Sequence, residues 1–429
     1  MAHFSSSCKT VAVLGIPFHN VTMEETLDLI EKLIDEGGFH QIATANVDFL
    51  RHAINDERLR STLCSCDVVI PDGMPVVWMS HLLGTPLKER VTGIDLVSRL
   101  AERAAERGYS VFLLGSSEVR SQLAAHTLAK RYPGLRIVGR YAPPPAQLDQ
   151  MDHEEILSRI EAAKPDILLV AFGNPKQEQW LARHRDRLKV PVCIGVGGTL
   201  DALAGGWQRA PRWMQSSGLE WLHRMSQEPR RLAARYASDA VCLLRHLPGY
   251  LTVSAAQPHR VGDRVAAQQI GNTCLISVSG DLTGERLTEF NTLSLDACLQ
   301  GRNIVVNLSN AGYMSAESLG SLIFLENRMR QRNEQLWLAG LPPHLRRVLH
   351  AGQLRNYFLT ATMVSDALNR TARIEQQQLS DHTPAPGAYR QQPAQVRVEL
   401  LQNACRRIVS ATEEAETVLT TAAFANAGR

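Results

Sequence analysis

The chain has 429 residues, of which 44% are hydrophobic and 21% are charged. This length favours two domains and a tail over a single domain, and a net charge of only +3 excludes the strong overall basicity of a typical nucleic-acid-binding protein. No apolar run approaches the roughly 20 residues that a membrane-spanning helix needs, so we expect any membrane contact to be peripheral.

The eight cysteines are scattered along the chain and do not form a disulfide framework. Cys64 and Cys66 lie closest together, but one intervening residue is too short a spacing for a usual zinc-binding pair. Several of the cysteines lie in apolar segments. We therefore expect reduced, buried thiols in a cytosolic protein, and no metal site.

Between residues 9 and 250, short apolar segments alternate with helical patterns. A helix is expected to begin at Thr22, which forms a capping box with Glu25, and another is expected from about Gly93 to Arg107. The segments that read as strands are 11–14, 41–44, 67–70, 110–114, 166–170 and 192–194. Strands that alternate with helices predict an α/β fold with a mostly parallel sheet covered on both faces.

Polar residues and glycines follow the ends of these predicted strands. They are Thr44, Asn46, Asp72, Gly115, Ser116, Gly173, Gln177, Gly197 and Gly198. In parallel sheets, ligands bind beyond the carboxyl ends of the strands, so together these residues favour a polar ligand with a diphosphate. The G-x-G-x-x-G fingerprint is missing, which counts against a nicotinamide-dependent dehydrogenase.

Asp72 stands in a Pro-Asp-Gly tripeptide directly after a predicted strand. Such a tripeptide is often only a turn, but an acid at this position is also placed to act as a general base for an attacking hydroxyl group. Gln177 and Glu178 have a similar ambiguity, because they could simply open a helix. The sequence alone leaves both interpretations open.

The stretch from residue 193 to residue 236 changes from a glycine-rich turn to an arginine-rich segment. Its arginines are accompanied by Trp207, Trp213 and Trp221. The arginines are Arg209, Arg212, Arg224, Arg230, Arg231 and Arg235. This pattern fits an amphipathic helix with a solvated basic face, and it fits equally a surface that meets an anionic, partly apolar partner such as a lipid headgroup.

These motifs resemble the WecG/TagA/CpsF family of bacterial glycosyltransferases over about residues 10–246. The segments that carry the resemblance are 44–46, 71–73, 90–95, 173–178, 195–201, 209–211, 218–224 and 228–231. The resemblance implies a Rossmann-like domain that transfers a hexose or an N-acetylhexosamine, such as N-acetylmannosamine, from a UDP-sugar to a polyprenyl-diphosphate-linked sugar. It also implies inversion of the anomeric centre, no metal and no cofactor, and a role in cell-surface or exopolysaccharide biosynthesis.

The resemblance also implies roles for individual residues. Asp72 corresponds to the proposed base. The substrate site would be formed by Thr44, Asn46, Arg90, Gly115, Gln177, Gly197 and Gly198. The lipid diphosphate would be bound by Arg224, Arg230, Arg231 and Arg235. These arginines would close over the site at the inner face of the cytoplasmic membrane, which makes the protein cytoplasmic and peripheral. Relatives with other donors share the motifs, so the donor sugar remains open.

A second domain is expected at 271–370, after a linker at 251–270. Strands are expected at 273–278, 303–308 and 336–339, and a helix at 315–332. This part resembles a STAS domain (sulfate transporter and anti-sigma-factor antagonist), so we expect an α/β module for protein interaction or nucleotide sensing. Ala316 stands at the position of the phosphorylated serine of anti-sigma-factor antagonists, which argues against phosphorylation-dependent switching. Ser315 is expected to cap the helix.

The tail at 371–429 is expected to be a disordered linker and a terminal helix, because 375–393 is rich in glutamine and proline and 396–420 has a helical pattern. The leading hypothesis for the whole chain is an active glycosyltransferase with a STAS module that binds an unidentified protein, with homo-oligomerisation left open. The alternative is a regulatory scaffold whose transferase domain is inactive and which acts through the STAS module. Asp72, Gln177 and the arginines favour the enzyme.

Overall fold

The computed structural model describes residues 9–262 and 264–381, without the side chains of residues 216 and 375–381. The described residues divide into two compact units. The first contains residues 9–259 with the segments 313–327 and 343–357, and the second contains the remaining described residues from 260 onwards.

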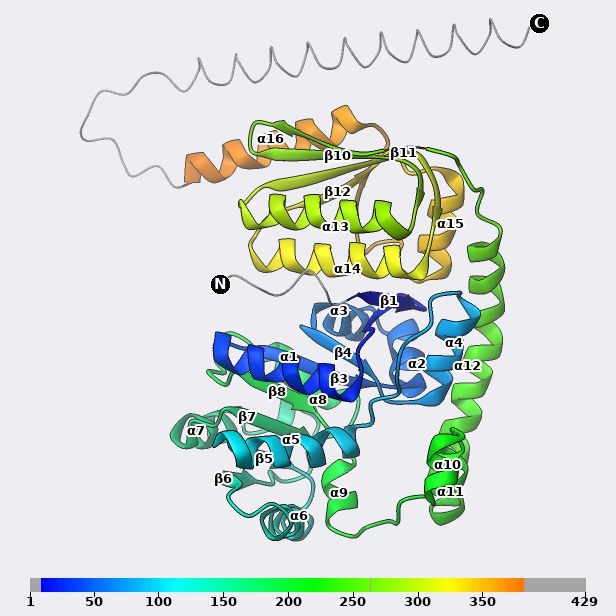
Figure 1. Cartoon of the computed structure of the whole chain (residues 1–429). Coiled ribbons are helices and arrows are strands. Elements are labelled where there is room, and N and C mark those ends of the chain that lie inside the picture. The colour runs from blue at the N-terminus through cyan, green and yellow to red at the C-terminus, as the bar shows by residue number, and fades with distance from the viewer. Residues whose placement is uncertain (1–8, 263, 382–429) are drawn as a thin grey trace, which may run out of the picture. The chain divides into compact units, whose positions relative to one another are not determined.

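Six strands of the first unit form one parallel sheet, in the order β4-β3-β8-β7-β5-β6. The strands are β3 (His40–Ala45), β4 (Val68–Pro71), β5 (Ser110–Gly115), β6 (Arg136–Tyr141), β7 (Ile167–Ala171) and β8 (Val192–Gly195). Because every pairing in this sheet is parallel, the carboxyl ends of all six strands lie at one edge. The predicted parallel α/β sheet is confirmed (Figure 1).

Helices cover both faces of this sheet, as the alternation of side chains along β5 illustrates. Val111 and Leu113 pack towards α1 (Met23–Glu36), α5 (Gly93–Arg107) and α6 (Glu118–Arg131). Phe112 and Leu114 pack towards α7 (His153–Ala163) and α8 (Lys176–Arg183) on the opposite face. Successive side chains of a strand point to opposite faces, so each strand contributes to two apolar cores. The predicted bounds of α5 and the capping box of Thr22 and Glu25 are both confirmed.

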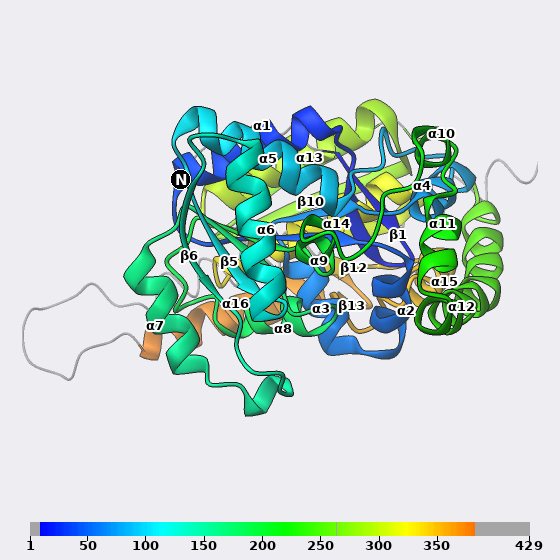
Figure 2. The same cartoon turned by 90° about the horizontal axis from the view of Figure 1, so that it is seen from below.

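The remaining helices within residues 9–259 connect the strands or follow β8. The connecting helices are α2 (Val47–Asn55), α3 (Glu57–Ser65), α4 (Met74–Leu82) and the 3-10 helix η1 (Leu148–Gln150). The helices after β8 are α9 (Thr199–Leu203), α10 (Arg212–Ser216), α11 (Glu220–Gln227) and α12 (Pro229–Ala255). Figure 2 shows α10, α11 and α12 grouped together, which confirms a helical arginine-rich segment after the sheet.

Two features of this unit differ from the prediction. The strand expected at 11–14 does not join the parallel sheet, because β1 (Thr10–Val13) and β2 (Ile16–His19) form an antiparallel hairpin. Leu14 and Gly15 both have positive φ angles, which is the backbone of a tight two-residue hairpin turn. Strand β6 was not predicted at all. It is an edge strand without a fully buried residue, so it lacks the continuous apolar pattern of the central strands.

The second sheet has five strands in the order β13-β12-β11-β10-β9. They are β9 (Val265–Ile270), β10 (Thr273–Leu282), β11 (Asn303–Met314), β12 (Leu336–Ala339) and β13 (Leu359–Ala361). Helices α13 (Gly284–Leu299) and α16 (Val364–Asp381) belong to the second unit, whereas α15 (Pro343–Ala351) and most of α14 (Ala316–Gln331) belong to the first. Figure 1 shows α13 and α16 on opposite faces of this mixed sheet. The Ser315 hydroxyl accepts a hydrogen bond from the Ser318 N–H at 3.1 Å, which confirms its role as a helix cap.

The linker expected at 251–270 is much shorter in the structure. Helix α12 continues to Ala255, and residues 265–270 form β9, which pairs antiparallel with β10. Strand β9 was missed because most of its side chains are exposed or half-buried, so its sequence looks like that of a polar loop. Helix α16 likewise continues to Asp381, into the region expected to be disordered. The helix expected at 396–420 lies outside the described residues.

A helix that crosses a bilayer must be both long and apolar. Within residues 9–262 and 264–381, none is both long enough and apolar enough to do so.

Candidate active site

A cavity of about 1100 Å³ opens beyond the carboxyl edge of the six-stranded sheet. Its walls come from the ends of the strands and from the helices that follow β8. Most of the residues predicted from sequence line it, namely Thr44, Asn46, Asp72, Arg90, Gln177, Gly197, Gly198, Arg224, Arg231 and Arg235. Gly115 and Arg230 are not among its lining residues. The cavity thus brings together residues that are up to 191 positions apart in the chain, from Thr44 to Arg235.

Asp72 lies directly after β4 and before the helix α4, which begins at Met74. Burial raises the pKa of its carboxyl group to about 7, and the nearby carboxylate of Glu220 acts in the same direction. The positive charges of Arg90 and Arg224 and a hydrogen bond from the Gly93 backbone oppose this rise. A carboxylate with a pKa near the working pH can accept a proton from a hydroxyl group and pass it on, so Asp72 is chemically suited to be a general base.

The raised pKa of Asp72 makes stability depend on pH. The unfolded carboxyl group ionises near its ordinary value of 3.8 and the folded one at about 7, so the folded state loses stability as pH rises between these values. We expect Asp72→Asn to increase the free energy of unfolding at pH 8 by roughly 1–2 kcal/mol, but to change it little at pH 4. Urea unfolding at both pH values measures this. An equal effect at pH 4 and pH 8 would contradict the assigned pKa.

Thr44 and Asn46 each have a structural contact at the end of β3. The Thr44 hydroxyl donates a hydrogen bond to the carbonyl oxygen of Gly195 at 2.9 Å, which joins β3 to β8. The Asn46 side-chain oxygen accepts from the Asp48 N–H at 3.1 Å and caps α2. Both residues therefore have fixed positions in the cavity wall.

Gln177 connects two loops at the edge of the sheet, and only 1% of it is exposed. Its Oε1 accepts hydrogen bonds from the backbone N–H groups of Gly173, at 3.2 Å, and Gly197, at 3.0 Å. Its Nε2 donates to Oε1 of Glu178 at 2.7 Å. Since Gly173 follows β7 and Gly197 follows β8, one amide group determines the spacing of the two glycine-rich loops.

Gly195 illustrates how closely these groups pack. A Cβ atom at this position would lie 2.6 Å from Nε2 of Gln177 and 2.6 Å from Oε1 of Glu178. We expect Gly195→Ala to lower the free energy of unfolding by about 1–3 kcal/mol, because a buried methyl group has no room there. Gly198→Ala is the matched control, since nothing lies within 4 Å of its Cβ position. Denaturant unfolding of the two variants provides the comparison, and equal stabilities would argue against this packing.

Ion pairs anchor the helices after β8 to the segment before α5. Nη1 of Arg90 lies 3.2 Å from Oε2 of Glu220, at the start of α11. Nε of Arg209 lies 2.7 Å from Oε1 of the same carboxylate, and its two terminal nitrogens donate to Asp95 at 2.8 and 3.1 Å. Glu220 is 8% exposed, so two arginines neutralise a nearly buried carboxylate. This network holds α11 at the rim of the cavity.

Arg224 and Arg235 carry charge that no carboxylate neutralises directly. Arg224 stacks on the ring of Trp207, with 4.0 Å from its guanidinium carbon to the ring centre, and Arg235 lies 4.9 Å from the ring centre of Tyr236. In the described part of the chain neither forms an ion pair, and each has a buried Nε without a hydrogen-bond partner. Burial and the neighbouring arginines lower the pKa of Arg224. Positioned guanidinium groups of this kind are suited to bind phosphate groups.

Arg231 and Arg230 differ from these two arginines. Arg231 lines the cavity but already pairs with Glu228, with 2.6 Å between Nε and Oε2. Arg230 is exposed and is not part of the cavity wall. The structure therefore brings three of the four predicted lipid-diphosphate arginines together.

Arg120 and Asp201 line the cavity but were not predicted as site residues. Nη1 of Arg120, near the start of α6, lies 3.1 Å from Oδ2 of Asp201. The other carboxylate oxygen of Asp201 accepts from the Ser116 hydroxyl at 2.5 Å. The sequence signal was present, because Ser116 follows β5 and Arg120 lies in the first turn of the next helix.

Gly115 has a structural role at the end of β5. It does not line the cavity, and it has a φ angle of +100°. A Cβ atom at this position would lie 2.7 Å from the carbonyl oxygen of Ala171. Glycine is required here because it lets β5 end close to β7 in a left-handed conformation.

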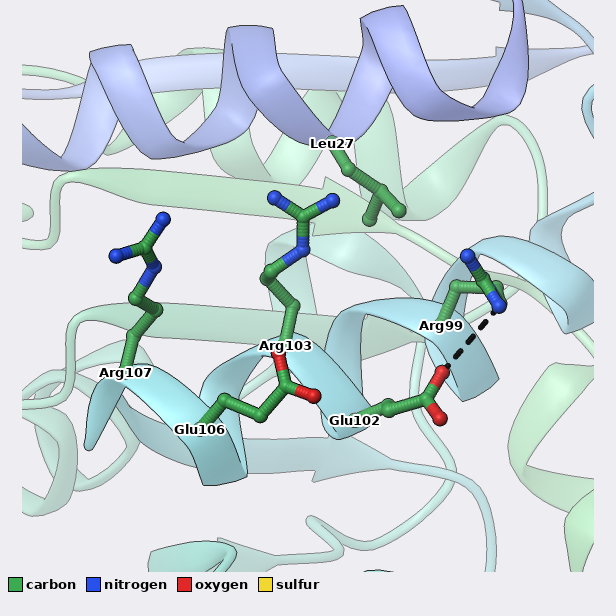
Figure 3. A pocket seen from close by; sticks show the side chains of 6 residues that line it. All are labelled: Leu27, Arg99, Glu102, Arg103, Glu106 and Arg107. Carbon is green, nitrogen blue, oxygen red and sulfur yellow. Dashed lines mark ion pairs between the residues drawn. The ribbon is translucent and has the colours of Figure 1, made fainter.

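A second, smaller hollow of about 410 Å³ lies between α1 and α5 (Figure 3). It is lined by Leu27, Arg99, Glu102, Arg103, Glu106 and Arg107. The three arginines pair with carboxylates, for example Arg99 with Glu102 at 3.4 Å and Arg103 with Glu31 at 3.1 Å. Exposed pairs of this kind contribute little to stability or binding. We therefore place the candidate site in the larger cavity.

Comparison with known proteins gives two matched regions. Residues 11–254 match the model of the glycosyl transferase WecG/TagA/CpsF family, and residues 265–364 match a STAS domain model described as Mlab. The second match begins at β9, so the predicted start of the second domain at residue 271 is six residues late. The STAS domain itself was predicted correctly.

Individual proteins are similar to about half of this chain. The N-acetylglucosaminyldiphosphoundecaprenol N-acetyl-beta-D-mannosaminyltransferase of Staphylococcus aureus strain MRSA252 is 31% identical over 229 residues, which are 53% of this chain and 88% of that protein. The protein of the same name from strain MW2 is 30% identical over the same length. Among solved structures, the unphosphorylated anti-sigma factor antagonist SpoIIAA matches 26% of this chain and 98% of its own, with 15% identity and a TM-score of 0.23.

Proposed function

The chain belongs to the glycosyl transferase WecG/TagA/CpsF family, and from this premise we propose that it transfers a sugar from a UDP-sugar to a polyprenyl-diphosphate-linked sugar. The transferred sugar is an N-acetylhexosamine or a hexose. N-acetylmannosamine is the first candidate, because the names of the Staphylococcus aureus relatives contain that sugar. The product extends a lipid-linked glycan for the cell surface or for an exopolysaccharide.

One observation carries this proposal. The same cavity holds a carboxylate with a pKa near neutrality, Asp72, and two arginines, Arg224 and Arg235, that form no ion pair with any residue that the structure describes. A glycosyl transfer needs both functions, because a proton must leave the acceptor hydroxyl and negative charge must develop on the leaving diphosphate. The ion pairs of Glu220 with Arg90 and Arg209 hold α11, the helix that carries Arg224, at the cavity.

The reaction that we propose is an inverting displacement. Asp72 accepts the proton of the acceptor hydroxyl as the acceptor oxygen forms a bond to the anomeric carbon. The bond between that carbon and the UDP oxygen breaks at the same time, so the configuration inverts and UDP leaves with its electron pair. Arg224 and Arg235 would stabilise the phosphate groups of UDP or of the lipid, and the N–H group of Gly198 would add a neutral donor. This chemistry does not require a metal.

We further propose that the protein works at the inner face of the cytoplasmic membrane. Trp213 on α10 is 64% exposed, and Trp221 and Leu222 on α11 are 38% and 42% exposed. Exposed tryptophans close to arginines favour the boundary between lipid headgroups and acyl chains. The STAS domain would bind a partner protein that brings this activity to a site of glycan assembly.

Release of UDP tests the proposed reaction. Purified protein is given a synthetic polyprenyl-diphosphate-N-acetylglucosamine and, one at a time, a panel of UDP-sugars. Release that depends on both the acceptor and one donor supports the proposal and identifies the donor. Binding of UDP without release from any donor would instead favour a scaffold with an inactive transferase domain.

A further inference from the structure

Glu178 is a buried acid to which the reaction above gives no role. It is 1% exposed and follows Gln177 in the first turn of α8. Its Oε1 accepts the hydrogen bond from Nε2 of Gln177 at 2.7 Å, and its Oε2 is buried and has no hydrogen-bond partner in the described part of the chain. Nothing in the fold requires an acid here, because a buried leucine or methionine would cost less than a carboxyl group without a partner.

Among the described residues, no positively charged side chain contributes to the pKa of Glu178. The backbone carbonyl of Glu178 accepts from Nε2 of Gln41 on β3 at 3.1 Å. From the end of α3, the Cys66 thiol faces it, and burial raises the pKa of that thiol well above its ordinary value. From β8, Gly195 lies close to the carboxyl group, because a Cβ atom there would be 2.6 Å from Oε1 of Glu178. Burial raises the pKa of Glu178 to about 8, although the hydrogen bond from Gln177 acts in the opposite direction.

The hydrogen bond between Glu178 and Gln177 determines which way the Gln177 amide faces. With Nε2 held by Glu178, Oε1 points at the N–H groups of Gly173 and Gly197. A flipped amide would present an N–H group to two N–H donors and leave both loops without an acceptor. Gly195 leaves the space for this arrangement, because a Cβ atom there would collide with both side chains.

We propose that Glu178, in its protonated form, is a positioning residue that holds the amide of Gln177 so that the loops after β7 and β8 keep the spacing needed to bind the donor diphosphate. Glu178 does not touch the substrate in this account. It acts through Gln177, and through Gln177 on two glycine-rich loops that come from separate strands. The part of the inference that concerns catalysis rests on the proposed function, whereas the part that concerns the loops does not.

Two variants separate this role from a purely structural one. Glu178→Gln keeps an oxygen acceptor for Nε2 of Gln177, whereas Glu178→Met has a similar size but no comparable acceptor. We expect the Gln variant to keep kcat/KM for the donor within about threefold, and the Met variant to lose roughly tenfold or more, a difference that corresponds to one lost hydrogen bond. Loss of activity to the same extent in both variants, or in neither, would overturn the proposal.

The pH profile gives a second readout that also works if the Met variant does not fold. Ionisation of Glu178 would create a buried, unsolvated charge, which the surrounding structure could accommodate only by opening to water, so wild-type kcat/KM should fall above about pH 8. In Glu178→Gln this alkaline decrease should be absent, because the amide does not ionise. An alkaline decrease with the same midpoint in both proteins would contradict the protonated form of Glu178.

Hydrogen exchange tests the loops independently of turnover. Peptides that contain Gly173 and Gly197 should exchange at least tenfold faster in Glu178→Met than in wild-type protein, and Glu178→Gln should match wild type. If no donor is turned over but this exchange pattern is found, the positioning role stands and the proposed function fails. If turnover is found but the exchange is equal in all three proteins, the positioning role is wrong and the proposed function is unaffected.

Discussion

Asparagine in place of Asp72 is expected to lower kcat by about 10²–10⁴-fold, the range that a positioned general base contributes. The amide has nearly the same shape as the carboxylic acid, so the cavity and its ion pairs should remain intact. It cannot accept a proton at neutral pH, so the acceptor hydroxyl is not activated. Steady-state kinetics with a saturating acceptor measure the effect. KM for the donor should change by less than threefold, because Asp72 is assigned to the acceptor and not to the diphosphate.

The control for this variant is Asp149→Asn. Asp149 lies on η1, its side chain is 88% exposed, and it does not line the cavity. The Asp149→Asn substitution removes one carboxyl group from the protein, as Asp72→Asn does, but leaves the proposed base in place. Below pH 7, wild-type kcat should fall with decreasing pH, because protonation of Asp72 at about 7 removes the active form. Full activity of Asp72→Asn, or a wild-type profile that is flat between pH 5 and pH 8, would rule out Asp72 as the base.

Alanine in place of Arg224 is expected to lower kcat/KM by about 10²-fold, which is the usual effect of removing one group that stabilises a developing negative charge. Arg224 is stacked on Trp207 and its charge is unpaired, so its guanidinium is free to bind phosphate without first breaking an ion pair. Arg224→Lys should recover only part of the loss, because lysine keeps the charge but does not reproduce the planar stack or the paired donors. Initial rates over a range of donor and acceptor concentrations would show which substrate is affected.

Arg230→Ala provides the comparison within the same segment. Arg230 is exposed and lies outside the cavity, so its loss should have a smaller effect than that of Arg224, and the effect should be greater on vesicles than in detergent if it contacts lipid headgroups. Equal losses for Arg224→Ala and Arg230→Ala under both conditions would mean that the segment acts through its overall charge and not through the position of each arginine.

The central strands and the helices α1 and α5 could be predicted from the sequence because burial determines them. Strands β5 and β7 are continuous apolar runs, and α5 begins at a capping threonine and ends before Gly108. Elements at the surface could not be predicted in this way. Both β6 and β9 are exposed edge strands, and their pairing depends on a neighbouring strand that local sequence does not reveal.

The residues of the candidate site likewise divide into those that the sequence could place and those that it could not. Strand-end residues such as Asp72 and Gln177 could be placed at one edge, because all strands of a parallel sheet present their carboxyl ends together. The partners of these residues could not be predicted. That Gln177 accepts from the Gly197 N–H, that Glu220 neutralises Arg90, and that Arg120 pairs with Asp201 are contacts between segments that only the folded chain brings together.

Mass spectrometry of the lipid-linked acceptor tests the central claim most directly. Wild-type protein is incubated with the polyprenyl-diphosphate-linked acceptor and the donor that supports UDP release, and the acceptor is then extracted and weighed. Our account predicts that the acceptor gains the mass of one sugar residue, and that Asp72→Asn gives almost none of this product over the same period. UDP release without a heavier acceptor would contradict the account, because it would mean that the cavity hydrolyses the donor and does not transfer the sugar.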